Sequence, residues 1–92
     1  MNINEVKKEN LHQLAFPTKD VLINHKEREQ RSYLLTQALK LSNMNKHKSK
    51  IIFRDYFGVS FVYTTIWFVS DKHIELKAGI SLPIQAILDI IL

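Results

Sequence analysis

Residues 59–70 read VSFVYTTIWFVS, a run of β-branched and aromatic side chains that is typical of a β-strand. The run is longer than the usual strand of about five or six residues. Its side chains do not alternate cleanly between apolar and polar, as they would in a strand with one face in water. Two interpretations stay open: a central strand that is covered on both faces, or a long strand that bends near Thr64 and Thr65 and serves both halves of a strongly twisted sheet.

Shorter segments on both sides of this run are predicted to pair with it. Residues 73–78 alternate most clearly between polar and apolar side chains, with the period of a strand. Gly58 and Gly79, the two glycines of the chain, lie at predicted chain reversals, where a positive φ angle suits glycine. Pro83 ends a short strand because it lacks a backbone donor. The predicted strands are residues 50–57, 59–70, 73–78, 80–82 and 88–92, with a tight turn at 84–87.

A helix is predicted before the sheet, over about residues 25–42. Asn24 is a suitable N-cap for it, and Leu35 and Leu39 lie on its apolar side. The expected fold class is therefore α+β, with the helix packed on a small, strongly twisted antiparallel sheet or an SH3-like barrel of about five strands. We expect residues 18–92 to form this single domain, and residues 1–17 to form an arm or a marginal helix outside it.

The composition excludes several classes of protein. The chain has 92 residues, enough for one small domain, and it has no cysteine, so it forms neither a disulfide nor a thiolate metal site. The uncharged run from Tyr56 to Ser70 is too short for the roughly 20 apolar residues that a membrane-spanning helix needs. No basic segment followed by an apolar one opens the chain, so we expect a cytoplasmic location and no membrane partner.

The order of the predicted elements after Lys50 resembles that of SH3-like and Sm-like small β-barrels. The residues that carry this resemblance are Gly58, Thr64–Trp67, Leu76–Gly79, Ile80–Ile84 and Ile87. Over about residues 20–90 the chain also looks like a small bacterial family that shares the patterns Thr-Thr-Ile/Val-Trp and Ile-x-Ile/Leu-Pro-Ile. The resemblance implies an N-terminal helix followed by a small barrel. It implies no activity, because that family has no assigned chemistry and the RNA-binding loop motifs of Sm-like proteins are not visible here.

Excess positive charge is concentrated in residues 26–50. This segment has seven lysines and arginines against two glutamates, an excess of five, whereas the whole chain has a net charge of +4. The segment is interpreted either as a surface for phosphate groups or as a solvated loop that keeps the protein soluble. The candidate nucleic-acid contacts are Arg28, Arg31, Lys40, Lys46, Lys48 and Lys50. Tyr56, Phe57 and Tyr63 are candidates for stacking on unpaired bases or for packing in the sheet.

Motifs of enzymes and of metal sites are missing from the sequence. There is no Gly-x-Ser-x-Gly motif, no phosphate-binding glycine loop and no His-Glu-x-x-His motif. The four histidines show no i, i+4 pair and no other metal-ligand spacing. We therefore expect no catalytic residue, no cofactor, no metal and no small-molecule substrate. A deep pocket that joined His73, Glu75 and another ionisable group would favour an enzyme instead.

The segment ILDIIL at residues 87–92 is more apolar than a single exposed edge strand should be. It either closes the barrel, pairs with the same strand of a second copy, or lies as a surface strand. The candidate oligomer edge consists of Leu88, Ile90 and Leu92. The leading hypothesis is a non-enzymatic binding module for nucleic acid, and the alternative is a structural or protein-interaction module that acts as a homo-oligomer through this strand.

Overall fold

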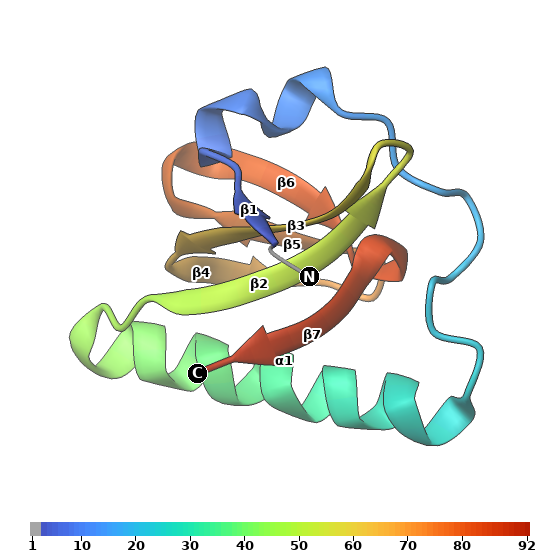
Figure 1. Cartoon of the computed structure of the whole chain (residues 1–92). Coiled ribbons are helices and arrows are strands. Elements are labelled where there is room, and N and C mark those ends of the chain that lie inside the picture. The colour runs from blue at the N-terminus through green and yellow to red at the C-terminus, as the bar shows by residue number, and fades with distance from the viewer. Residues whose placement is uncertain (1–2) are drawn as a thin grey trace.

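A computed structural model describes residues 3–92, in which one long helix packs against two small sheets (Figure 1). The helix α1 spans His25–Asn45, and three short 3-10 segments are η1 (Lys8–Gln13), η2 (Lys77–Gly79) and η3 (Ile84–Ala86). The first sheet has the order β1-β3-β2-β7 and the second the order β4-β5-β6. Their strands are β1 (Asn4–Glu5), β2 (Ser49–Asp55), β3 (Gly58–Thr64), β4 (Ile66–Val69), β5 (His73–Leu76), β6 (Ile80–Pro83) and β7 (Ile87–Ile91).

The run at residues 59–70 is a bent strand that takes part in both sheets. Its first half is β3, which pairs antiparallel with β2 from Ser49 opposite Thr64 to Asp55 opposite Gly58. Its second half is β4, which pairs with β5 in the other sheet. Thr65 separates the halves, and Thr64 and Thr65 are both buried. Of the two interpretations of this run, the structure has the strand that bends at these two threonines. Val62, Thr64 and Ile66 are buried on one face of it, whereas the aromatic residues Tyr63 and Trp67 of the other face are about half-exposed.

Local sequence signals produce the hairpin between β2 and β3. Gly58 has φ +139°, a value in the region that favours glycine. The side chain of Asp55 accepts hydrogen bonds from the backbone N–H groups of Phe57 and Gly58, at 2.6 Å and 3.1 Å. An aspartate that binds the backbone of its own turn is a common way to close such a reversal.

The helix α1 starts where its sequence predicts, and Leu35 packs as expected, but the helix continues to Asn45. Asn24 is its N-cap, because its side chain accepts a hydrogen bond from the N–H of Lys26 at 2.8 Å. The buried positions of α1 are Arg31, Leu35, Ala38 and Ser42, spaced three or four residues apart. The first buried position is Arg31, so the turns of the helix before it lie in solvent. No helix within residues 3–92 is long and apolar enough to cross a membrane.

The sheets do not close into the barrel that was one of the two expected forms. Strand β7 pairs with β2 at one edge of the first sheet, and β4 pairs with β5 at one edge of the second. Helix α1 contacts both β4 and β7, and Figure 1 shows it running alongside β7. The helix therefore covers the side on which the barrel would have to close. The structure confirms the α+β class, with seven strands in residues 3–92 rather than about five.

Residues 3–17, from the segment expected to form an arm or a marginal helix, contain η1 and pack against the sheets, and residues 1–2 lie outside the described part of the chain. Leu11 of η1 has only 1% of its surface exposed and belongs to the core, and η1 contacts β3 and β6. Strand β1 pairs parallel with β3, and the N–H of Val6 donates to the carbonyl of Phe61 at 2.8 Å. The core is formed by Leu11, Leu35, Ala38, Ile51, Phe53, Val62, Ile66, Ile74, Leu76, Leu82, Ile87 and Ile90.

Candidate functional site

A groove of about 700 Å³ lies at the C-terminal end of α1. Three segments meet there: the end of the helix with the loop that follows it, the start of β4, and the turn after β5. The groove is lined by Ser42, Asn43, Lys46, Lys48, Thr65, Trp67 and Lys77. Three of these seven residues are lysines and none is acidic, so the groove presents positive charge beside an aromatic ring.

Lys46 reaches the groove from a backbone position that does not suit a lysine. It ends α1 in the left-handed conformation, with φ 58° and ψ 35°, and its N–H donates to the carbonyl of Ser42 at 2.8 Å. Glycine is the usual residue at this position of a helix end. For a residue with a Cβ atom, this left-handed conformation lowers the stability of the fold by roughly 1 kcal/mol. The sequence thus places a cationic side chain at a site where glycine would be more stable.

Trp67 points away from the core because it alternates with the buried Ile66, and it lies at an irregularity in β4. Ile66 pairs with Leu76 and Phe68 with Glu75, so Trp67 is an extra residue in the pairing of β4 with β5. Such bulges change the direction of a side chain and are frequent beside functional sites. The indole is 51% exposed. The N–H of Lys77 donates to the carbonyl of Thr65 at 3.2 Å, which fixes the Lys77 turn beside the start of β4.

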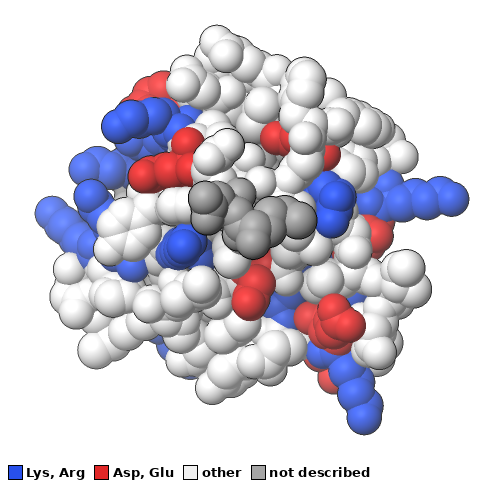
Figure 2. All heavy atoms as spheres, in the orientation of Figure 1, with Lys and Arg blue, Asp and Glu red and all other residues white. Residues whose placement is uncertain are grey.

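The lysines of the groove are not neutralised by carboxylates. No salt bridge within the described part of the chain involves Lys46, Lys48 or Lys77. The Nζ atom of Lys48 lies 5.8 Å from the centre of the Tyr63 ring, within the range of a cation–π contact. Figure 2 shows Lys and Arg side chains gathered at the upper left, at the height of β1 and η1 in Figure 1, with some acidic side chains among them.

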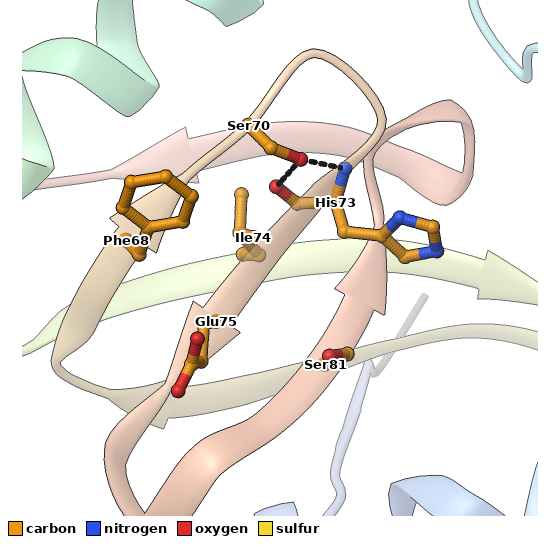
Figure 3. A pocket seen from close by; sticks show the side chains of 6 residues that line it. All are labelled: Phe68, Ser70, His73, Ile74, Glu75 and Ser81. Atoms are coloured by element: carbon orange, nitrogen blue, oxygen red, sulfur yellow. Dashed lines mark hydrogen bonds between the residues drawn. The ribbon is translucent and has the colours of Figure 1, made fainter.

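A second hollow, of about 300 Å³, contains the residues that would have favoured an enzyme. It is lined by Phe68, Ser70, His73, Ile74, Glu75 and Ser81. The hydroxyl of Ser70 donates to the carbonyl of His73 and accepts from its N–H, both at 3.0 Å, so it serves the turn between β4 and β5. In Figure 3 the imidazole of His73 and the carboxylate of Glu75 point in different directions. This hollow does not join the two groups at one reactive point.

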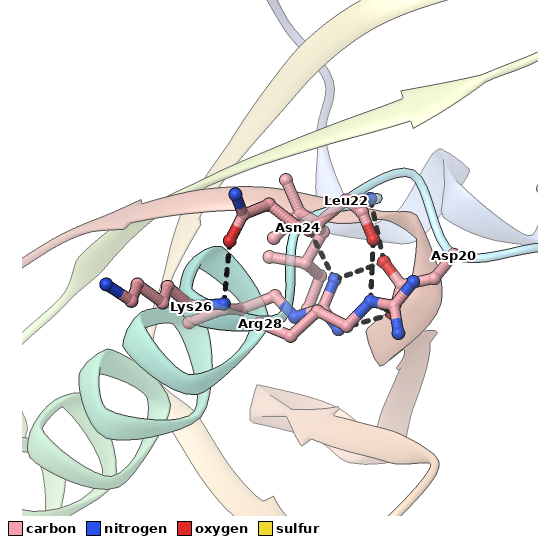
Figure 4. A network of polar contacts seen from close by, with 7 residues as sticks. Asp20, Leu22, Asn24, Lys26 and Arg28 are labelled. Carbon is pink, nitrogen blue, oxygen red and sulfur yellow. Dashed lines mark hydrogen bonds and ion pairs between the residues drawn. The ribbon is translucent and has the colours of Figure 1, made fainter.

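Two of the predicted nucleic-acid contacts, Arg28 and Arg31, lie at the opposite end of α1 (Figure 4). Arg31 is only 5% exposed, and its two terminal nitrogens donate to both carboxylate oxygens of Asp20, at 2.8 Å and 2.6 Å. One of them also donates to the carbonyl of Ile87 at 3.0 Å. The Nε atom of Arg28 donates to the carbonyl of Leu22 at 2.7 Å. Both arginines hold the chain before α1 in place. Arg31 is buried, whereas 45% of the Arg28 side chain is exposed, and contact of these arginines with nucleic acid stays a prediction.

The other predicted positions are divided as well. Lys46 and Lys48 line the groove, whereas Lys40 is exposed on α1 outside it, and the Nζ atom of Lys50 lies 4.2 Å from the centre of the Phe61 ring. The predicted oligomer edge at β7 consists of residues that differ in burial, and its role in self-association stays a prediction. Its members are Leu88, which is half-buried, Ile90, which is 3% exposed and part of the core, and Leu92, which is exposed.

Five of the seven groove residues are not among the predicted site residues, and Trp67 and Lys77 are the aromatic and the charged residue of these five. The sequence places Trp67 in the central strand and Lys77 among the polar, solvent-facing positions of the strand at residues 73–78. A lysine beside the Ala78-Gly79 reversal is a signal that could have indicated an exposed charged turn, and Ala78 is indeed exposed in that turn with φ 71°. Trp67 alternates with Ile66 in the strand, but the sequence does not show which face of this run is buried, because both faces carry apolar residues.

Metal ligation and relatives give no further guidance. Within residues 3–92 no three His, Asp or Glu side chains are grouped so that they could hold a metal ion. The resemblance to SH3-like and Sm-like barrels and to a bacterial family stays a prediction. Comparison of the chain with protein-family models, with curated proteins and with solved structures finds no match.

Proposed function

We propose that this chain is a non-enzymatic binding module that binds single-stranded nucleic acid in the groove at the end of α1. One observation carries the proposal: three lysines and a half-exposed tryptophan line the same groove, and no acidic residue lines it. Lysines that neutralise phosphates release bound counterions and so give an affinity that depends on salt. An exposed aromatic ring beside them offers a face on which an unpaired base can stack.

A single strand suits this groove better than a duplex. The bases of a duplex are already stacked on one another, so the indole of Trp67 would have no free base to contact. In a single strand each base has an open face, and stacking on an aromatic side chain contributes about 1–3 kcal/mol per base. Ser42 and Asn43 add polar groups to the groove wall that can bind phosphate, sugar or base edges.

The proposal is tested by fluorescence anisotropy with a labelled single-stranded oligonucleotide and its duplex, at low and moderate salt. We expect the single strand to bind more tightly and the binding to weaken steeply as salt is raised. The double variant Lys46→Glu with Lys48→Glu should lose most of the affinity.

A matched control has the same change in charge at the other end of α1. Lys19→Glu with Lys26→Glu alters two exposed lysines outside the groove and should retain most of the affinity. The proposal is wrong if the unmodified chain fails to bind at low salt, or if the two double variants weaken binding equally.

Self-association through β7 is the second candidate, favoured by the exposure of Ile91 and Leu92 at the end of that strand. It is weaker because α1 contacts β7 and Arg31 already binds the carbonyl of Ile87. Light scattering at several concentrations distinguishes the two candidates. A variant with Ile91→Lys and Leu92→Lys is a suitable probe, whereas Ile90→Lys would disrupt the core. A dimer that the probe variant converts to a monomer would support this candidate, and a monomer at all concentrations would rule it out.

A further inference from the structure

Lys48 borders a further hollow, called here the hollow at Tyr63, in addition to the groove. This hollow has a volume of about 260 Å³ and lies where the segment after β1 passes the end of β3. It is lined by Glu5, Val6, Lys7, Lys8, Glu9, Lys48, Val62 and Tyr63. Because Lys48 lines both, the groove at the end of α1 and this hollow are adjacent on the surface.

Like the groove, the hollow at Tyr63 joins lysines with an exposed aromatic ring, but it is also lined by two glutamates. Tyr63 is 53% exposed there, so its ring can be reached from solvent. The Nζ atom of Lys48 lies beside that ring, at 5.8 Å from its centre. Lys8 is bound by Glu9 at 3.0 Å, which leaves Lys7 and Lys48 as the lysines of this hollow with no salt bridge among residues 3–92. An aromatic face and a lysine thus occur on both sides of Lys48.

The spacing of the two aromatic residues matches a continuous strand. Four residue steps separate Tyr63 from Trp67 along β3 and β4, which is at most roughly 13 Å between their Cα atoms. The bend at Thr65 shortens that distance further. A few nucleotides of an extended single strand can cover it, with a phosphate passing Lys48 between the two rings.

We infer that the bound strand continues from the groove across Lys48 into the hollow at Tyr63, so that one base stacks on Trp67 and another on Tyr63. This inference rests on the proposed function and adds the length and the path of the ligand. Glu5 and Glu9 also line the hollow, and because their carboxylates repel phosphate we place the end of the track at these two residues.

The test is a series of thymidine oligonucleotides of increasing length, titrated into the unmodified chain and into single variants at low salt. Tyr63→Thr should weaken binding of an oligomer of eight nucleotides by roughly tenfold and leave binding of a dinucleotide unchanged. Trp67→Thr should weaken binding of both. Tyr56→Thr is the matched control, because Tyr56 is an exposed tyrosine at the β2–β3 turn that lines neither hollow.

A second variant tests the same hollow in case the Tyr63→Thr protein does not fold. Lys7→Glu changes an exposed side chain outside the core, and it should also weaken binding of the longer oligomer alone. If Trp67→Thr weakens binding while Tyr63→Thr and Lys7→Glu bind every length normally, the extension is wrong and the groove stands. If the unmodified chain binds no oligomer at low salt, the proposed function and the extension are both wrong.

Discussion

The two ends of α1 use the same kind of residue in opposite ways. At the N-terminal end, the guanidinium of Arg31 is buried and bound to Asp20 and to the carbonyl of Ile87. At the C-terminal end, Lys46 and Lys48 border an open groove without a carboxylate. The ends lie roughly 30 Å apart, because the 21 residues of α1 each rise about 1.5 Å. A local excess of positive charge can therefore be part structural and part available to a ligand.

The largest effect is expected from breaking the N-terminal end. Arg31→Met should lower the free energy of unfolding by about 3 kcal/mol, because it leaves the carboxylate of Asp20 and the carbonyl of Ile87 without their partner. Urea denaturation followed by circular dichroism measures this loss. Arg28→Met is the control: its partly exposed side chain lies 3.8 Å from Asp20, so less than about 1 kcal/mol should be lost. Equal losses in the two variants would mean that the buried pair is not the main support of this end.

A binding effect of roughly tenfold is expected at the other end. Trp67→Thr removes the aromatic face of the groove and keeps a residue that suits a strand. Phe68→Thr is its control, since Phe68 is the adjacent exposed aromatic residue but lines the hollow at His73. Anisotropy titrations with one single-stranded oligonucleotide compare the variants. Similar affinities for both would separate Trp67 from the binding site.

A smaller effect in both stability and binding is expected from Lys46→Gly. Glycine relieves the left-handed strain at φ 58°, so the free energy of unfolding should rise by about 1 kcal/mol. Affinity should fall at the same time, and the slope of log affinity against log salt should become shallower by about 0.7 if one phosphate contact is lost. Ala78→Gly relieves similar strain at φ 71° without removing a charge, and it should stabilise the chain with unchanged affinity. A Lys46→Gly variant that binds as the unmodified chain does would remove Lys46 from the interface.

The smallest expected effect is on the pH dependence of stability, and it comes from Asp20 at the N-terminal end of α1. Burial acts to raise the pKa of Asp20, but the hydrogen bonds from Arg31 and Leu22 and the charges of Arg31 and Arg28 together hold this pKa below its ordinary value of 3.8. The carboxylate therefore stabilises the fold above that pH, and its contribution is lost as the pH falls further. Urea midpoints measured down the acid range should fall less steeply in Arg31→Met than in the unmodified chain. Parallel curves would contradict this assignment.

Features set by neighbouring residues could be predicted from the sequence. The helix cap at Asn24, the hairpin at Gly58 and the bend at Thr65 depend on local propensity and periodicity, and the structure has all three. The role of Arg31 could not be predicted in this way. Its partners lie 11 and 56 residues away in the chain, so charge alone made it resemble a surface contact.

Features that depend on how distant segments meet were not predictable. The bulge at Trp67 and the turn at Lys77 become part of one site only when β4 reaches the end of α1. The barrel does not close because α1 covers β4 and β7, and the packing of a helix on two edges has no periodic pattern in sequence. The basic segment at residues 26–50 indicated the region of the site, and of its candidate residues the fold places Lys46 and Lys48 in the groove.

The central claim is most directly tested by the fluorescence of Trp67, the single tryptophan of the chain. Its emission should change saturably as a thymidine octanucleotide is added at low salt, because a base stacks on the indole, and the change should disappear when salt is raised. Emission that stays constant at low salt throughout the titration would contradict the claim that a nucleic-acid strand occupies the groove at the end of α1.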